Sequence, residues 1–234
     1  MHDIGRGGLS RRMDQALGLK QMFGVRDTLV VPVLAPVQDE AAGEVLAQLM
    51  ADLERLGEPC TLLDARGARH VDDLAHQILM TARMPDRDLG QRTGEFGSPL
   101  SGLSLVFAVM ADAKIADILA PDSDCLVLVD THPARLTQTY AAAKRLMQAR
   151  PDVRQQLIAY GGSLNMAARG GARVGSLLTQ VAPAGGALSG GRSALLGCHA
   201  PREGLVQQVA ERLLALSFAV LPQPAVATPS GALH

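Results

Sequence analysis

The sequence predicts an α/β protein in which a doubly wound, mostly parallel sheet is covered by helices on both faces. Two observations lead to this fold class. The run TLVVPVLAP at residues 28–36 is almost continuously apolar, which is typical of a strand buried on both faces. Further runs of this kind alternate with segments whose apolar residues recur at helical spacing. This alternation predicts βαβ units with right-handed crossovers.

The first βαβ unit is predicted over residues 28–65. After the first strand, apolar residues recur every three or four positions between Asp39 and Leu56. Asp39 is placed to cap the start of this helix, and Gly57 is placed to end it. The run CTLLDA at 60–65 then predicts the second strand.

The alternation continues to residue 160 and then becomes weaker. A polar, glycine-rich connection at 85–102 is predicted to be an exposed loop. Beyond residue 160, the many glycines leave only 174–181 as a predicted helix before a last amphipathic core helix at 203–216. The other predicted elements are helices at 71–83 and 112–119, strands at 103–109, 125–129 and 156–160, and a helix with the apolar stripe Leu136, Tyr140, Ala143 and Met147 that ends at Pro151.

Length and composition predict one α/β domain at 27–221, preceded by a short segment at 1–26 and followed by a disordered Pro-rich tail at 222–234. The 22 Lys and Arg residues nearly balance the 23 Asp and Glu residues, so no overall field attracts nucleic acid. The odd number of cysteines, namely Cys60, Cys125 and Cys198, favours buried thiols over disulfides. Since no signal peptide or membrane span is recognisable, we expect a cytoplasmic protein.

The turn after the first strand is where a nucleotide site is expected in such a fold. Phosphate binding there requires glycine N–H groups and a neutralising lysine. The segment LAPVQDEAAGEV at 34–45 instead offers Pro36, which has no N–H, together with the acidic Asp39 and Glu40. The sequence therefore predicts that this turn does not hold a triphosphate.

A second glycine-rich segment, GALSGGRS at 186–193, fits the phosphate-loop pattern G-x-x-x-x-G-K-S except that Arg192 replaces the lysine. No predicted strand precedes it, so we interpret it as a flexible loop and keep Arg192 and Ser193 as candidate cofactor-binding residues. Asp64, at the end of the second strand, is a third candidate because carboxylates in such positions often hold magnesium.

Other residues with chemical potential are better explained structurally. Asp112 is placed to cap a helix, and DTHP at 130–133 is typical of a turn closed by proline rather than of an Asp130–His132 acid–base pair. The adjacent Cys198 and His199 lack ligand spacing, as does the pair His70 and His76, so no metal site and no catalytic residue is predicted.

Residues 123–146 resemble a segment of the MinD/ParA-type ATPases, in which a strand is followed by proline and a helix of the form S/T-x-x-D-A-Y-A-x-x-K. The matching positions are Pro133, Thr137, Tyr140, Ala141 and Lys144. The second strand is similar as well, with Asp64 retained and Arg66 in place of a second aspartate. The resemblance implies a P-loop NTPase scaffold, which in typical members binds ATP and magnesium. Because the lysine and glycines of the phosphate loop are missing, we expect no cofactor here and a scaffold without ATP turnover.

The segment before the predicted domain resembles one group within this family. Asp14, Gln15 and Ala16, followed by Leu19 and Lys20, resemble the D-Q-A-x-x-L-R prefix of the flagellar regulators of the FlhG (FleN) group. In that group the prefix is a helix that docks on the signal-recognition-type GTPase FlhF and supplies a glutamine to its catalytic site. The resemblance implies that Asp14, Gln15, Ala16 and Leu19 activate a partner GTPase. A helix at this position that packs on its own domain is the alternative.

As a whole, the resemblance implies a regulator of flagellar number or placement. Its partners would be an FlhF-type GTPase and other flagellar regulatory or switch proteins, which would bring it to the cell pole; no nucleic acid and no more than weak membrane contact are expected, and homodimers occur in the family. Two alternatives stay open: an ATPase that uses the loop at 186–193, and an adaptor for another polar machine such as cellulose secretion or chromosome partitioning.

Overall fold

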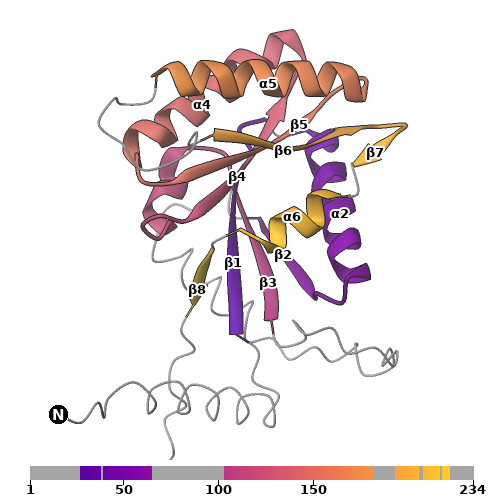
Figure 1. Cartoon of the computed structure of the whole chain (residues 1–234), viewed down its shortest axis with the longest axis vertical. Helices are drawn as coiled ribbons and strands as arrows, with labels where there is room; N and C mark the ends of the chain where they lie inside the picture. The colour runs from indigo at the N-terminus through magenta and orange to yellow at the C-terminus, as the bar shows by residue number, and fades with distance from the viewer. Residues whose placement is uncertain are drawn as a thin grey trace, which may run out of the picture.

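A computed structural model describes residues 27–37, 39–64, 103–181, 193–205, 208–216 and 218–221. Its helices are α2 (Glu40–Arg55), the 3-10 helix η1 (Ala113–Ile118), α4 (Pro133–Ala149), α5 (Leu164–Val181) and α6 (Gln208–Leu214). Its strands are β1 (Asp27–Leu34), β2 (Cys60–Asp64), β3 (Leu103–Met110), β4 (Asp124–Asp130), β5 (Arg154–Tyr160), β6 (Ser193–Ala200), β7 (Gly204–Leu205) and β8 (Ala219–Leu221). Together they form the α/β domain that Figure 1 shows.

The strands form one eight-stranded sheet in the order β2-β3-β1-β4-β5-β6-β7, with β8 paired to β1 outside this path. All strands from β1 to β6 pair in parallel, while β7 and β8 pair antiparallel to β6 and β1. β1 lies between β3 and β4, so the chain winds outward from it in both directions. The predicted doubly wound, mostly parallel fold is therefore confirmed, and its switch point lies between the carboxyl ends of β1 and β4.

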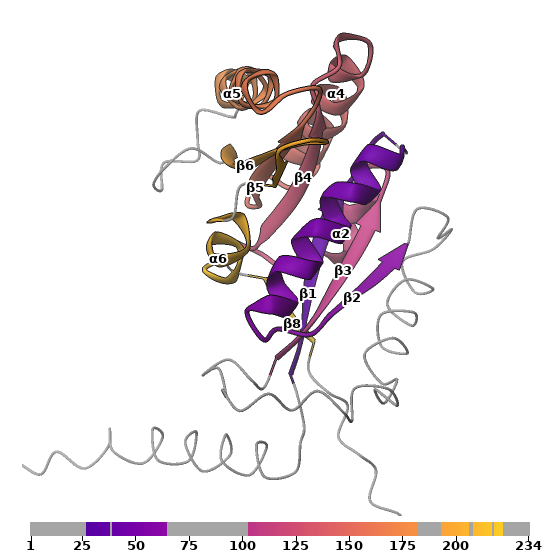
Figure 2. The same cartoon turned by 90° about the vertical axis from the view of Figure 1, so that its right-hand side faces the viewer.

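Helices cover both faces of the sheet, as predicted (Figure 2). α4, α5 and η1 lie on one face, where Ile115, Leu146 and Val174 are fully or almost fully buried. α2 and α6 cover the other face, where Leu49 and Leu213 are fully buried. Two separate apolar cores result, and they explain why the central strands are apolar on both sides.

The predicted start and end of α2 are confirmed. The carboxylate of Asp39 accepts a hydrogen bond from the backbone N–H of Ala42 at 2.9 Å, which is N-capping geometry. After the helix, Gly57 has a φ of 90°, a conformation that glycine adopts without a Cβ penalty. Asp112 is likewise a cap, because its side chain accepts from the N–H of Lys114, at the start of η1.

The prediction of a helix only at 174–181 was wrong at its start, because α5 begins ten residues earlier at Leu164. Glycine suggested a loop there, but its role is close packing. A Cβ on Gly171 would lie 2.7 Å from the Cβ of Ala159 in β5 and 2.7 Å from a methyl group of Leu195 in β6. Glycine therefore lets α5 approach the sheet more closely than a larger residue would allow.

Two further corrections concern the C-terminal part. β6 was not predicted, since its glycine interrupts the apolar run; a Cβ on Gly197 would lie 2.0 Å from a methyl group of Val209 in α6. The helix predicted at 203–216 is shorter, because Glu203 lies in a turn and Gly204 begins β7. Its prediction as a core helix is confirmed, since Val209 is 1% exposed.

Several predictions lie outside the described residues. They include the prefix with Asp14, Gln15, Ala16 and Leu19, the helix at 71–83, the loop at 85–102, Arg192 and the tail at 222–234. Within the described part of the chain, no helix is both long enough and apolar enough to span a bilayer.

Candidate functional site at the carboxyl ends of the strands

A pocket of about 260 Å³ opens at the carboxyl ends of β4, β5 and β6, facing the start of α2. This is the edge of the sheet at which ligands bind in doubly wound folds. The lining residues are Asp39, Ala41, Asp130, His132, Arg135, Tyr160, Gly161, Gly162, His199 and Pro201. Four separate segments of the chain thus contribute polar side chains to one place.

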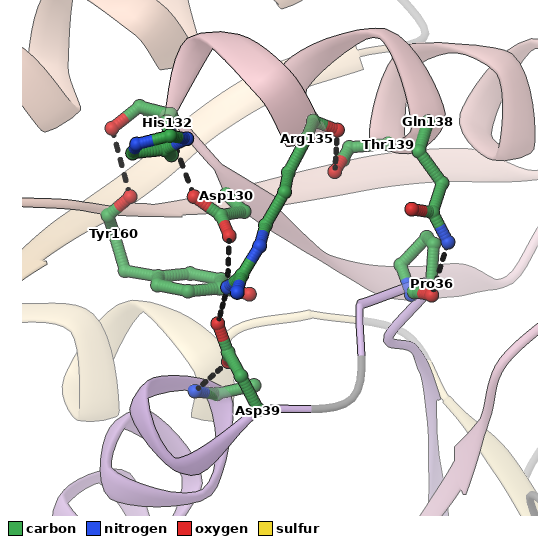
Figure 3. Close-up of polar contacts among 10 residues, drawn as sticks. Pro36, Asp39, Asp130, His132, Arg135, Gln138, Thr139 and Tyr160 are labelled. Carbon is green, nitrogen blue, oxygen red and sulfur yellow. Dashed lines mark hydrogen bonds and ion pairs between the residues drawn. The ribbon is translucent and has the colours of Figure 1, made fainter.

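Asp39 lies at the start of α2 and uses both of its carboxylate oxygens. Oδ1 accepts the capping hydrogen bond from the N–H of Ala42, and Oδ2 forms an ion pair with Nη1 of Arg135 (Figure 3). The N-terminal end of a helix attracts negative charge, because its N–H groups are unpaired and its dipole is positive there. The carboxylate of Asp39 supplies that charge from within the chain.

Asp130, the last residue of β4, plays the same role at the start of α4. Its Oδ1 accepts a hydrogen bond from the N–H of His132 at 2.8 Å, and its Oδ2 lies 3.2 Å from Nη1 of Arg135. Pro133 then opens α4, a position where its missing N–H costs nothing. The prediction of a structural turn is confirmed, but the ion pair with Arg135 was not foreseen.

Arg135 joins the two carboxylates. Its side chain is 47% exposed, whereas that of Asp130 is 5% exposed, so the guanidinium closes over the buried acid from the solvent side. The hydrogen bond with Asp130 raises the pKa of Arg135, and the nearby charge of Asp39 adds to this effect. The guanidinium therefore remains charged and keeps the starts of α2 and α4 together.

A second contact links the same two elements. The side-chain Nε2 of Gln138, one turn further along α4, donates to the backbone carbonyl of Pro36 at 2.9 Å. Pro36 belongs to the segment between β1 and α2 (Figure 3). α4 therefore fixes both the end of β1 and the start of α2.

Tyr160 and His199 provide the floor of the pocket from β5 and β6. The two residues are neighbours in the sheet, and both side chains are almost completely buried. Burial raises the pKa of Tyr160, and the charges of Asp39 and Asp130 raise it further. Burial lowers the pKa of His199, although the charge of Glu44 opposes this shift. Both side chains are therefore held in their neutral forms near pH 7.

Thr131 fixes the end of β4 to the end of β5. Its N–H and its hydroxyl both donate to the backbone carbonyl of Tyr160, at 3.0 and 2.8 Å. A Cβ on Gly161 would lie 2.2 Å from the hydroxyl of Thr131, and one on Gly170 would lie 2.5 Å from its methyl group. Glycine at these two positions makes room for the threonine that positions Tyr160.

The structure does not bring the predicted cofactor-binding residues to this pocket. Ser193 lies at the start of β6, paired with Gln155, and therefore at the opposite edge of the sheet. Asp64 ends β2 on the correct edge, but β3 and β1 separate it from β4, and it does not line the pocket. The residues that sequence reasoning missed are Arg135, Tyr160 and His199. The sequence offered one clue to them, namely that Tyr160 and His199 lie at the ends of strands and Arg135 lies in the first turn of the helix after β4.

The cysteines remain free thiols. Burial raises the pKa of Cys60 and of Cys125 to about 12, and it also raises that of Cys198. All three thiols are therefore protonated near neutral pH and are poor nucleophiles. Among the residues that the structure describes, no group of three or more His, Cys, Asp or Glu side chains is arranged to hold a metal ion.

Comparison with known proteins gives similarity to solved structures. No protein-family model matches the chain, and no curated protein matches it either. Among solved structures, it is similar to the MinD cell division protein of Aquifex aeolicus, with 14% sequence identity and a TM-score of 0.44. The alignment covers 83% of this chain and 100% of that chain.

Proposed function

We propose that the chain is a MinD/ParA-type scaffold without ATP turnover, which regulates flagellar number or placement in the manner of the FlhG group. It would act by stimulating an FlhF-type GTPase through Asp14, Gln15, Ala16 and Leu19. The sequence resemblance of the prefix and of residues 123–146 supports this role. The latter segment forms β4 and most of α4, and residues at the junction of the two line the pocket described above.

The observation that carries the proposal is the contact of Asp39 and Asp130 with the same guanidinium. In an ATP-binding protein of this fold, the positive helix end after β1 faces phosphate oxygens. Here the carboxylates of Asp39 and Asp130 already accept from backbone N–H groups at the starts of α2 and α4. These residues do not fit a triphosphate. The negative charges of Asp39 and Asp130 would repel its phosphates, and Arg135 could bind a phosphate only by breaking its ion pairs with both carboxylates.

The proposed activity resides in the prefix. A neutral glutamine amide can orient an attacking water in the active site of a GTPase, so Gln15 is the residue that we assign to this task. Ala16, Leu19 and Phe23 are spaced to form one apolar stripe of a helix that docks on the partner. An isolated helix of this length is marginal in water, so binding would stabilise it.

The direct test is GTP hydrolysis by the FlhF-type GTPase of the same organism, with and without the full-length chain. We expect stimulation by the wild type and its loss with Gln15→Ala. Gln21→Ala is the matched control, since it removes the same side chain from the same prefix and should leave stimulation intact. Equal stimulation by the wild type and Gln15→Ala would refute the activator role and favour an adaptor for another polar machine.

The absence of ATP turnover is tested separately by calorimetric titration of the full-length chain with ATP and magnesium. We expect no saturable heat. Micromolar binding that Arg192→Ala abolishes would instead support an ATPase that uses the loop at 186–193. Micromolar binding that persists in Arg192→Ala but is lost when Arg135 is changed would place the nucleotide in the pocket and overturn the proposal.

A further inference from the structure

Two neighbouring strands each carry a buried side-chain oxygen that has no hydrogen-bond partner in the part of the chain that the structure describes. These atoms are Oε1 of Gln155 in β5 and Oγ of Ser193 in β6. Gln155 is only 1% exposed, so bulk water does not reach its amide. Native proteins satisfy nearly all of their buried polar groups, and an oxygen left without a partner costs stability. The two oxygens therefore indicate that something binds between them.

The side chains of Gln155 and Ser193 lie next to each other on one face of the sheet. The two residues are register partners in the parallel pair of β5 and β6, whose backbones are about 4.8 Å apart. The next pair on this face, Leu157 and Leu195, packs into the core under α4 and α5. The two oxygens are therefore enclosed together between the sheet and this helical layer.

The orientation of the Gln155 amide is fixed by α4. Its Nε2 donates to the backbone carbonyl of Ala143 at 2.9 Å. A flipped amide would place two acceptor oxygens against each other, so Oε1 remains on the side away from this carbonyl. Val153 and Leu157, the residues before and after Gln155 on the same face of β5, are buried, and their side chains have no donor. Oε1 therefore requires a donor from elsewhere.

We propose that a buried water molecule bridges Oε1 of Gln155 and Oγ of Ser193. Water donates to an amide oxygen and at the same time donates to a hydroxyl or accepts from it, so it satisfies both atoms. Both oxygens are enclosed, so the bound molecule must be small, and water in protein interiors typically makes about three such hydrogen bonds. The bridge would connect α4 to β6 through β5, from the carbonyl of Ala143 to the hydroxyl of Ser193.

This water site gives Ser193 a structural role that is independent of the regulatory function proposed above. Ser193 is the last residue of the segment GALSGGRS at 186–193. In a phosphate loop, the hydroxyl of this serine binds magnesium and therefore has to face the nucleotide. A hydroxyl that is enclosed beside Gln155 and bonded to a buried water does not face a nucleotide. The serine would thus serve the packing of β6 against the helical layer.

The direct test is a crystal structure of the full-length chain at a resolution that shows ordered water. We expect a peak of density within about 3 Å of both Oε1 of Gln155 and Oγ of Ser193. Three results would overturn the proposal: a direct hydrogen bond between the two side chains, a protein group in the place of the water, or two separate oxygens with no density between them.

Urea unfolding of Gln155→Met, Ser193→Ala and the double variant tests the bridge in solution. Each single change removes one partner of the water, so each should lower the urea midpoint. The double variant should lose less than the sum of the two single losses, because neither oxygen is then left behind. The lost bond to Ala143 is common to Gln155→Met and the double variant, so it cancels in this comparison.

Gln180→Met is the matched control, since it changes an exposed glutamine of α5 in the same way and should leave the midpoint nearly unchanged. Losses of Gln155→Met and Ser193→Ala that simply add up would overturn the bridge. Neither experiment involves the GTPase, so a negative result here leaves the proposed function untouched.

Discussion

Asp39 and Asp130 lie far apart in the sequence, but their carboxylates share the single guanidinium of Arg135. Asp39 begins α2 and Asp130 ends β4, so this contact joins two βαβ units at the switch point of the sheet. The stability of this region should therefore depend on the positive charge of Arg135, which separates two negative charges.

Replacing Arg135 with glutamine leaves two carboxylates close together without a cation. We expect Arg135→Gln to lower the urea midpoint of unfolding, and we expect Asp39→Asn in the same chain to restore part of the loss. Asparagine retains the N-cap of α2 while removing one of the repelling charges. The loss should be smaller at high salt, because half-exposed charges are screened.

Arg145→Gln is the control, since Arg145 is exposed on the same helix. An equal loss in Arg145→Gln and Arg135→Gln would show that the effect comes from helix propensity or net charge. The shared guanidinium would then have no measurable role in stability.

Gly171 and Gly43 are predicted to respond to alanine with opposite signs. A Cβ on Gly171 would lie 2.7 Å from that of Ala159, whereas no residue packed against α2 in the described part of the chain comes within 4 Å of one on Gly43. Overpacking should cost Gly171→Ala about 1–3 kcal/mol of unfolding free energy. Alanine loses less backbone entropy than glycine when the helix forms, so Gly43→Ala should raise the unfolding free energy by about 0.5–1 kcal/mol. Chemical denaturation of both variants tests this, and a Gly171→Ala variant at least as stable as the wild type would contradict the close packing of α5.

Arg150 is predicted to be irreplaceable by lysine. Its Nη1 donates to the carbonyl groups of Ala116 and Leu119 at 2.9 and 2.6 Å, and its Nε and Nη2 donate to Asp152 at 3.0 and 2.7 Å. An ammonium group cannot reproduce this fork, so Arg150→Lys should lose about 1–3 kcal/mol of unfolding free energy. Arg145→Lys, on the exposed face of α4, should be nearly neutral; a comparable loss there would refute the role of the fork.

His199 is predicted to make stability depend on pH. Burial lowers its pKa in the folded state below the ordinary value of 6.5. The unfolded chain therefore binds the proton more readily, so the stability contributed by neutral His199 is complete above this value and is lost as the pH falls through the folded pKa. Between about pH 7.5 and about pH 5.5, His199→Gln should lose less stability than the wild type.

The exposed His132 in the same pocket provides the comparison for this prediction. His132→Gln should keep the pH dependence of the wild type when urea unfolding is measured at both pH values. If His199→Gln and His132→Gln retain the same dependence, the burial of His199 does not control it.

Much of the fold follows from local sequence patterns. The apolar runs predict β1 and β3 to β5 because strands buried between two helical layers need apolar residues on both faces. The shorter run at 60–65 predicts β2, which lies at the edge of the sheet and is partly exposed. The cap at Asp39 and the end at Gly57 were predictable for the same reason, since capping depends on neighbouring residues alone. Patterns of this kind failed at α5 and β6, where Gly171 and Gly197 are required by neighbours distant in the sequence.

The sequence by itself determined the alternation of strands and helices and the lack of a glycine-rich, lysine-bearing turn after β1. Only the tertiary structure decided that Asp39, Arg135 and His199 meet at one pocket, because strand order and register bring together residues from separate βαβ units. An ion pair between residues of separate elements depends on their positions in space, so no local pattern encodes it. Periodicity, by contrast, is a property of neighbouring residues, and this is why the elements could be predicted and the pocket could not.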